Sequence, residues 1–221
     1  MHLKIQAVIF DMDGVITDTM PYHFEVWKDL FLREGIPVTH EDIYKREGQK
    51  GIDSVREIFT EYGKSFSEDH ARALLKEKEE LFQKIFKRHF IPGALDFVRS
   101  LHAQGFKLAL VTGTSRIEAL KLLPEDIFAL FHTSVCGCEV KNGKPDPEPY
   151  LIALRKLGIT ADEAVVIENA PFGIRSAKAA GLKCLALETS LPRPYLNQAD
   201  AVYQSFGDLI SHVQFENSVQ V

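Results

Sequence analysis

The sequence predicts an α/β protein with a doubly wound, Rossmann-like parallel sheet and a small all-helical cap inserted after the first strand. Three observations predict it. Short apolar runs recur along the chain, as expected for strands that helices cover on both faces. Helical patterns alternate with these runs over residues 92–208, which is typical of a parallel sheet. Over residues 19–91 the alternation stops, and only amphipathic helical patterns are found.

The predicted strands and helices of the core follow one another in a regular order. The first strand covers about residues 4–10, an apolar run that ends at Asp11. Strong strand patterns recur in FKLALVTG, AVVIENA and KCLALET, and weaker ones in HTSVCG and DAVYQS. Helices are predicted between them, over residues 94–104, 116–123, 147–157 and 173–180. Glycine follows directly after the first, third and fourth of these helices, which is a common stop signal.

The chain is predicted to divide into two domains. Residues 1–17 and 91–221 form the core with its sheet, and residues 18–90 form the helical cap. Because the chain leaves the core after the first strand, we expect the cap to lie over the carboxyl end of that strand as a lid. The two crossings, residues 17–20 and 88–92, then form the hinge.

Composition favours a protein that acts on small molecules. The 221 residues are 45% apolar, enough for a proper core, and the formal net charge is −5. That charge argues against a nucleic-acid surface, and no basic block suggests binding to an anionic membrane. No apolar stretch approaches the roughly 20 residues that span a bilayer, so a cytoplasmic protein is expected. The three cysteines cannot all pair and lack the partners of a zinc site, so reduced thiols are expected.

Two carboxylates follow the first predicted strand in the segment DMDG. Asp11 and Asp13 are two residues apart, so in extended backbone their side chains point the same way, and Gly14 permits a tight turn. A hard divalent cation relieves their repulsion, and Mg²⁺ prefers carboxylate and phosphate oxygens. Taken alone, the segment is equally consistent with a solvated acidic turn.

Two further segments carry groups that suit a phosphate. Thr112, Gly113 and Thr114 follow the strand LALV and offer hydroxyl and backbone N–H groups at a helix start. Simple N-capping is the alternative for these residues. Lys144, in GKPDP, can balance the negative charge of phosphate and aspartate. The alternative is an exposed lysine in a loop.

A fourth segment adds oxygen ligands. Glu168 and Asn169 follow the strand AVVI. All four segments lie at the ends of predicted strands or in loops between a strand and a helix, so we expect them to converge on one crevice at the carboxyl edge of the sheet.

The motifs DMDGVITD, VTGTS, GKPDP and VIENAPFGI, in this order, resemble the four signature motifs of the haloacid dehalogenase (HAD) superfamily. The resemblance covers nearly the whole chain. The helical insertion after the first motif is similar to that of the branch containing β-phosphoglucomutase and phosphoglycolate phosphatase.

The resemblance implies roles for individual residues. Asp11 is expected to attack phosphorus and form an aspartyl-phosphate, while Asp13 protonates the leaving oxygen and later activates water. Mg²⁺ is expected to be bound by the Asp11 carboxylate, the Asp13 backbone carbonyl and Asn169. Thr112 and Lys144 are expected to hold the phosphoryl oxygens.

The fourth motif departs from the usual pattern of two acidic residues or Gly-Asp followed by a small hydroxyl residue, because it contains Glu168, Asn169 and Ala170. Asn169 offers an amide oxygen without charge, so we expect weakened Mg²⁺ binding. Glu168 is expected to carry more of the metal's charge, directly or through a water molecule.

Substrate choice is expected to come from the cap. His23 follows the hinge and Lys50 lies in the cationic segment YKREGQKGIDSVR, so both are candidates for binding substrate. The alternatives are a solvated face for the segment with Lys50, because acidic residues are interleaved there, and ordinary helix packing for His23 beside Trp27. β-Phosphoglucomutases carry an arginine in this loop where Gly51 aligns here, which lowers the mutase interpretation.

We therefore predict a Mg²⁺-dependent phosphatase that hydrolyses a small phosphorylated metabolite, a sugar phosphate being one option. A monomer without nucleic-acid or membrane partners is expected. A β-phosphoglucomutase-type phosphotransferase and a noncatalytic phosphometabolite-binding protein remain as alternatives.

Overall fold

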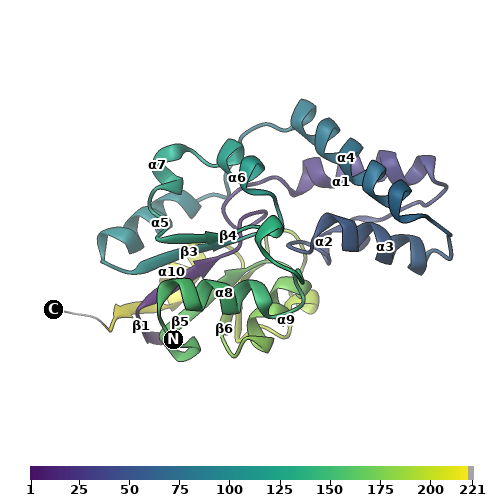
Figure 1. Cartoon of the computed structure of the whole chain (residues 1–221). Helices are drawn as coiled ribbons and strands as arrows, with labels where there is room; N and C mark the ends of the chain where they lie inside the picture. The colour runs from purple at the N-terminus through teal and green to yellow at the C-terminus, as the bar shows by residue number, and fades with distance from the viewer. Residues whose placement is uncertain (219–221) are drawn as a thin grey trace.

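A six-stranded parallel sheet forms the centre of the molecule in the computed structural model, which describes residues 1–218 (Figure 1). The strand order is β4-β3-β2-β5-β6-β7, and every neighbouring pair is parallel. The strands are β2 (Ala7–Phe10), β3 (Lys107–Val111), β4 (Thr133–Val135), β5 (Ala164–Glu168), β6 (Lys183–Leu187) and β7 (Ala201–Tyr203). The doubly wound fold predicted from the sequence is confirmed, as is each of the five later strand patterns.

The opening strand was predicted wrongly as one element. It consists of β1 (His2–Ile5) and β2, which lie in different sheets and are separated at Gln6. β1 pairs with β8 (Gln214–Asn217) and is alternately exposed and buried, whereas β2 is buried throughout. An apolar run of this length does not reveal such a break, and β8 was not predicted because QFEN is short and polar.

Helices cover both faces of the sheet. Alternate side chains of β2 enter two separate apolar clusters, with Val8 and Phe10 in one and Ala7 and Ile9 in the other. The first cluster includes side chains of α5 (Ala94–Ala103), α6 (Arg116–Leu122), α7 (Glu125–Phe128) and α10 (Phe206–His212). The second includes side chains of α8 (Glu148–Leu157) and α9 (Pro171–Ala179). Burial on both faces explains why the core strands are apolar without alternation.

Four helices project beyond the sheet as a separate group (Figure 1), here called the cap. They are α1 (Met20–Arg33), α2 (His40–Tyr44), α3 (Gly51–Glu61) and α4 (Glu68–Ile85). Helix α4 packs against α1 and α3 through apolar faces that include Leu30, Phe59 and Phe82. The predicted all-helical insertion is therefore present, while the boundaries at residues 18 and 90 remain a prediction.

The two crossings between core and cap lie side by side. Thr17 and Phe90 form an antiparallel bridge. The backbone N–H of Ile91 donates to Ile16 O at 3.0 Å, and that of Asp18 donates to His89 O at 3.0 Å. This pairing places both predicted hinge segments at one point.

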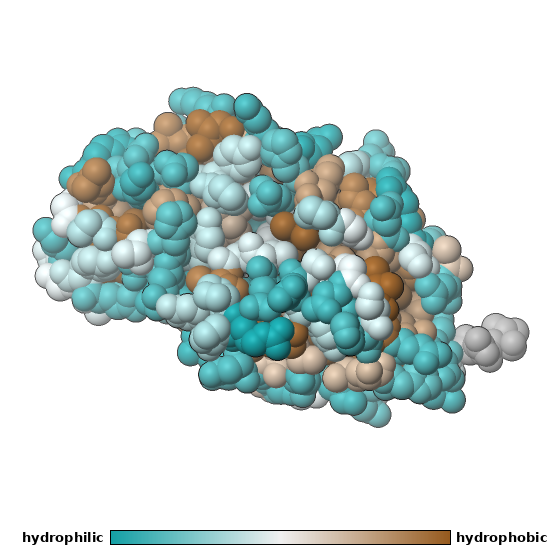
Figure 2. Space-filling model, turned by 180° about the vertical axis from the view of Figure 1, so that it is seen from behind, coloured by the Kyte–Doolittle hydropathy of each residue, from teal (hydrophilic) through white to brown (hydrophobic). Residues whose placement is uncertain are grey.

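The surface mixes polar and apolar residues. Figure 2 shows the apolar residues of one face as small patches among hydrophilic ones, which is ordinary for a protein surface. Across residues 1–218, no helix combines the length and apolar character needed to cross a membrane.

Candidate active site

The candidate site lies at the carboxyl ends of the central strands. β2 lies between β3 and β5, so the strand order reverses there, which is where doubly wound sheets bind their ligands. Asp11 follows β2, Thr112 follows β3, and Glu168 ends β5. Lys144 comes from the loop before α8 and joins them. The expected convergence of the four sequence segments is thus found in the structure.

Lys144 forms the buried centre of this cluster. Its Nζ donates to Asp11 Oδ1 and to Glu168 Oε1 at 2.6 Å each, and to Val111 O at 3.2 Å. The side chain is only 1% exposed, so it is not the loop lysine of the alternative interpretation. Its three N–H donors all have acceptors from the chain itself.

The two carboxylate oxygens of Asp11 differ in their contacts. Oδ1 accepts from Lys144, whereas Oδ2 is buried and has no hydrogen-bond partner among residues 1–218. Burial, offset in part by Lys144 and reinforced by Glu168, raises the pKa of Asp11 to about 8. Further positive charge is therefore needed to keep Asp11 ionised at neutral pH.

Asp13 is surrounded by hydrogen-bond donors. Oδ1 accepts from Thr19 and lies 3.5 Å from Nε2 of His23, while Oδ2 accepts from Thr114 at 3.0 Å and from Thr112 at 3.4 Å. Burial alone would raise the pKa of Asp13, but the contacts with His23, Thr19 and Thr114 lower it to about 2. The resting structure therefore holds Asp13 as a carboxylate.

Glu168 is fully engaged by the protein. Oε1 accepts from Lys144 and, at 2.7 Å, from the hydroxyl of Tyr150, and Oε2 accepts the backbone N–H groups of Asn169 and Ala170. With both oxygens occupied, Glu168 positions Lys144 in this structure. Its predicted role as a metal ligand stays a prediction.

Asn169 bridges the core and the cap. Its Nδ2 donates to Glu47 Oε2 at 2.9 Å and to Ser190 Oγ at 2.8 Å. Its Oδ1 is buried, with no partner in the described part of the chain, and the same is true of Glu47 Oε1. Burial and the carboxylates of Asp11 and Asp13 raise the pKa of Glu47 well above its usual value. Glu47 was not predicted as a site residue, because a charged residue in a loop between helices is usually exposed to solvent.

The site fits a divalent cation through a mixed set of oxygens. Within residues 1–218, no three His, Cys, Asp or Glu side chains already form a metal-binding group. Asp11 Oδ2, Asn169 Oδ1 and Glu47 Oε1 are instead buried acceptors for which the described residues supply no donor. Hard cations such as Mg²⁺ accept carboxylate and amide oxygens together, so this donor set suits them.

The cap loop with Gly48 lies directly on the core. A Cβ at Gly48 would approach Lys144 Cδ to 2.5 Å, and the backbone there has a φ of +75°. A Cβ at Gly113 would lie 2.6 Å from the carbonyl oxygens of Gly48 and Gln49. Only glycine permits these approaches, so the structure represents the cap closed over the core.

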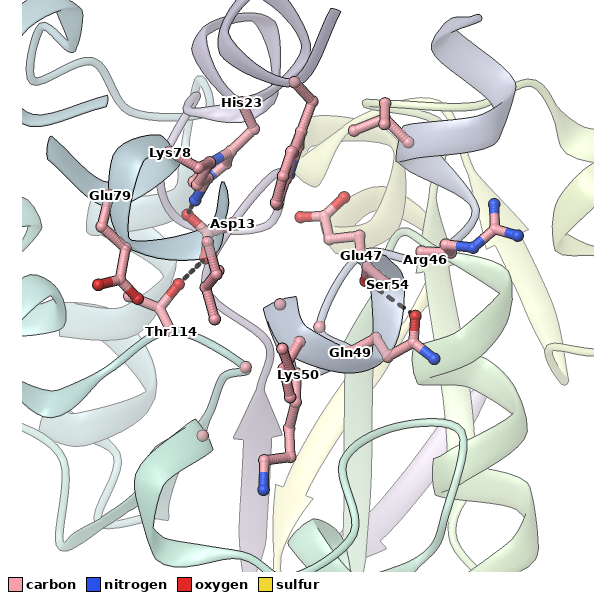
Figure 3. A pocket seen from close by; sticks show the side chains of 18 of the residues that line it. Asp13, His23, Arg46, Glu47, Gln49, Lys50, Ser54, Lys78, Glu79 and Thr114 are labelled. Atoms are coloured by element: carbon pink, nitrogen blue, oxygen red, sulfur yellow. Dashed lines mark hydrogen bonds and ion pairs between the residues drawn. The ribbon is translucent and has the colours of Figure 1, made fainter. Parts of the chain in front are cut away.

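A cavity of about 250 Å³ lies between the closed cap and the core (Figure 3). Core residues that line it include Asp13, Gly113 and Thr114. Lys78 of α4 lines it from the cap, is 9% exposed, and lies 5.0 Å from the ring centre of Phe82. Burial lowers the pKa of Lys78, while carboxylates including Asp13 act in the opposite direction.

Lys78 was missed by the sequence analysis, although a signal was present. It occupies the buried stripe of α4 together with Ala71, Leu74 and Phe82. A lysine at an apolar position of an amphipathic helix is unusual unless its ammonium group meets a partner or a ligand.

The two predicted cap residues lie in different surroundings. His23 stacks on Phe82, with ring centres 4.2 Å apart, and reaches Asp13 at the cavity wall. Lys50 lines the cavity with its stem, but its Nζ donates to the backbone carbonyls of Val140 and Lys141 at 3.3 and 3.2 Å. In Figure 3 its ammonium group points away from Asp13. Lys50 therefore joins cap to core here, and its predicted substrate contact stays a prediction.

The chain is similar to a known family of hydrolases and to two named phosphatases. A family model described as haloacid dehalogenase-like hydrolase matches residues 5–181. The chain is 38% identical over 190 residues to a phosphorylated carbohydrates phosphatase of Thermotoga maritima, covering 81% of this chain and 83% of the relative. It is 34% identical over 214 residues to the mitochondrial (DL)-glycerol-3-phosphatase 1 of Arabidopsis thaliana, covering 93% and 72%.

A solved structure shares the whole architecture. A candidate β-phosphoglucomutase of Bacteroides vulgatus superposes with a TM-score of 0.85 at 34% sequence identity, covering 95% of this chain and 88% of that one. The similarity therefore includes the cap as well as the sheet.

Proposed function

Because the chain belongs to the haloacid dehalogenase-like hydrolase family, we propose that it is a Mg²⁺-dependent phosphatase that hydrolyses small phosphorylated carbohydrates through an aspartyl-phosphate. The observation that carries this proposal is the Asp11 carboxylate. One oxygen is fixed by Lys144, and the other is buried and has no partner within residues 1–218, at the point where the strand order reverses. Such a carboxylate is oriented for attack and costs little reorganisation.

Asp11 and Asp13 divide the reaction between them. Asp11 Oδ2 attacks phosphorus, the bond from phosphorus to the leaving oxygen breaks, and that oxygen takes a proton from Asp13. Water then attacks the aspartyl-phosphate, gives its proton to Asp13 and releases inorganic phosphate and the Asp11 carboxylate. Because its hydrogen bonds favour the carboxylate, Asp13 is ready as the base of the second step and has to be protonated before the first.

The charge balance requires a cation. The Asp11 carboxylate, the Asp13 backbone carbonyl and Asn169 Oδ1 would hold Mg²⁺, which when bound supplies the positive charge that lets an anionic nucleophile approach an anionic phosphate. Lys144 keeps Asp11 in place. Lys144 and the hydroxyl groups of Thr112 and Thr114, which pair with Asp11 and Asp13 in this structure, would turn to phosphoryl oxygens when substrate binds.

The cavity supports a small substrate. At about 250 Å³ it is slightly below the roughly 300–1,000 Å³ of typical ligand pockets, so it suits a sugar or polyol phosphate better than a nucleotide. The names of the two relatives, phosphorylated carbohydrates phosphatase and glycerol-3-phosphatase, support the same substrate class.

The mutase alternative is less well supported. Gly51 occupies the position where β-phosphoglucomutases are expected to carry an arginine for a second phosphate. A Cβ at Gly51 would lie 2.5 Å from Leu75 Cδ1, so a larger side chain there would have to displace Leu75. Without that arginine, the site has lost the planar fork that binds a second phosphate.

Substitution of Lys78 should weaken substrate binding. We expect Lys78→Met to raise KM by about tenfold or more, because the buried ammonium group faces the cavity and charged hydrogen bonds contribute about 1.5–3 kcal/mol. Steady-state kinetics on the best substrate measures this. Lys76→Met is the matched control, since Lys76 is an exposed lysine of the same helix and should leave KM unchanged. Equal KM values for both variants would remove Lys78 from the substrate site.

A panel of phosphorylated metabolites tests the proposed function. We expect release of inorganic phosphate from small sugar and polyol phosphates with Mg²⁺ and none after chelation. β-Glucose 1-phosphate is included with and without a bisphosphate primer. Isomerisation that depends on the primer would replace the phosphatase by a mutase, and binding without turnover would indicate a noncatalytic protein.

A further inference from the structure

We propose that Glu47 of the cap supplies the carboxylate that the fourth motif lacks at Asn169, so that Mg²⁺ binding and cap closure are linked. The proposal rests on the proposed function only in taking a divalent cation to bind beside Asp11. A cap residue would then complete the set of metal ligands that the core motifs supply only in part.

The contact between Glu47 and Asn169 places the carboxylate at the site. Asn169 Nδ2 donates to Glu47 Oε2 at 2.9 Å, across 122 positions of sequence. Glu47 is 6% exposed and Asn169 is completely buried. The remaining oxygen of each side chain, Glu47 Oε1 and Asn169 Oδ1, is buried without a donor in the part of the chain described. Burial of a carboxylate oxygen without a partner is energetically unfavourable. The pair is therefore arranged for a ligand that binds both oxygens at once.

The surrounding charge favours a cation as that ligand. Asp11, Asp13 and Glu168 are buried near Glu47, and Lys144 is the ammonium group that pairs within this cluster. Lys144 already uses its three donors on Asp11, Glu168 and Val111. The carboxyl groups of this cluster therefore outnumber the ammonium group that pairs with them, and a divalent ion would balance the excess.

The position of Glu47 depends on cap closure. Glu47 precedes Gly48, whose backbone oxygen lies against Gly113 of the core and whose Cα faces Lys144. Movement of the cap about its hinge would withdraw Glu47 from Asn169. By linkage, a metal that binds the closed form more tightly must also stabilise closure.

The alternative is that Glu47 is a neutral carboxyl group that only holds the cap through its hydrogen bond to Asn169. Glutamine has nearly the same shape and an amide oxygen that accepts the same bond. Glu47→Gln therefore removes the charge and keeps the contact, which separates the two interpretations.

Calorimetric titration with Mg²⁺ in the absence of substrate tests the proposal. We expect Glu47→Gln to weaken Mg²⁺ binding by about tenfold or more, the range typical of lost groups around a metal. Adding Asn169→Asp to Glu47→Gln should restore the affinity, because the carboxylate is returned from the core side. Glu41→Gln is the matched control, since Glu41 also joins cap to core, through the hydroxyl of Tyr195 at 2.8 Å, but is exposed and should not affect the metal.

Hydrogen exchange measured on the same proteins tests the link to closure. Mg²⁺ should protect the backbone N–H groups of residues 45–51 from exchange in the wild type and the Glu41→Gln protein. It should not protect them in the double variant, because all the proposed metal-binding carboxylates of that variant belong to the core. Unchanged Mg²⁺ affinity in a folded Glu47→Gln protein would overturn the proposal. If that protein also kept phosphatase activity, the proposed function would stand. A wild type that binds Mg²⁺ as expected but hydrolyses no phosphoester would contradict the proposed function alone.

Discussion

Asp11→Asn should abolish phosphate release, lowering kcat by about 10⁴-fold or more, the range seen when a covalent nucleophile is removed. The asparagine oxygen can still accept from Lys144, so the geometry of the cluster is kept. The amide cannot form an acyl phosphate that water then hydrolyses. Because burial disfavours the charged form of Asp11, loss of the charge should not lower the melting temperature.

Asp18→Asn is the matched control for this variant. Asp18 lies in the same motif but is exposed at the hinge, so kcat should stay close to that of the wild type. Binding of a phosphorylated sugar should survive in the Asp11→Asn protein. Residual turnover above one hundredth of the wild-type rate would show that Asp11 is not the nucleophile.

Lys144→Met should cost both stability and activity. Removal of the ammonium group leaves Asp11 and Glu168 buried without their positive partner, and breaking such a pair typically costs 3–5 kcal/mol. We therefore expect the free energy of unfolding in urea to fall by about 3 kcal/mol or more, with phosphate release falling to background.

Lys141→Met provides the comparison for Lys144→Met. Lys141 is an exposed lysine three positions earlier in the same loop, and its substitution should change the free energy of unfolding by less than about 0.5 kcal/mol. If Lys144→Met unfolds at the same urea concentration as the wild type, the buried cluster does not carry the stability assigned to it.

Much of the core site could be predicted from the sequence, for a physical reason. Asp11 and Thr112 each follow an apolar strand and Glu168 ends one, and parallel strands present their carboxyl ends at one edge of the sheet. Lys144 comes from a loop, and it was predicted to belong to the site from the motif rather than from periodicity. The same strand patterns predicted the sheet, except for the break at Gln6 and the polar strand β8.

The cap side of the site could not be predicted in the same way. Glu47, Lys50 and Lys78 all occur in charged amphipathic segments, and which of them meets the core depends on how four helices pack and close. Lys50 was singled out, yet its ammonium group binds carbonyls of the core. Glu47 became recognisable only through its contact with Asn169.

The most direct test of the central claim is to trap the phosphorylated aspartate. In Asp13→Asn the base of the second step is removed, while acetyl phosphate can still phosphorylate Asp11 because its leaving group needs no proton. After acid quenching, mass spectrometry should find one phosphoryl group on the peptide containing Asp11 and none in the Asp11→Asn/Asp13→Asn protein. A phosphoryl group on another residue, or phosphate release without any phosphorylated peptide, would contradict the mechanism.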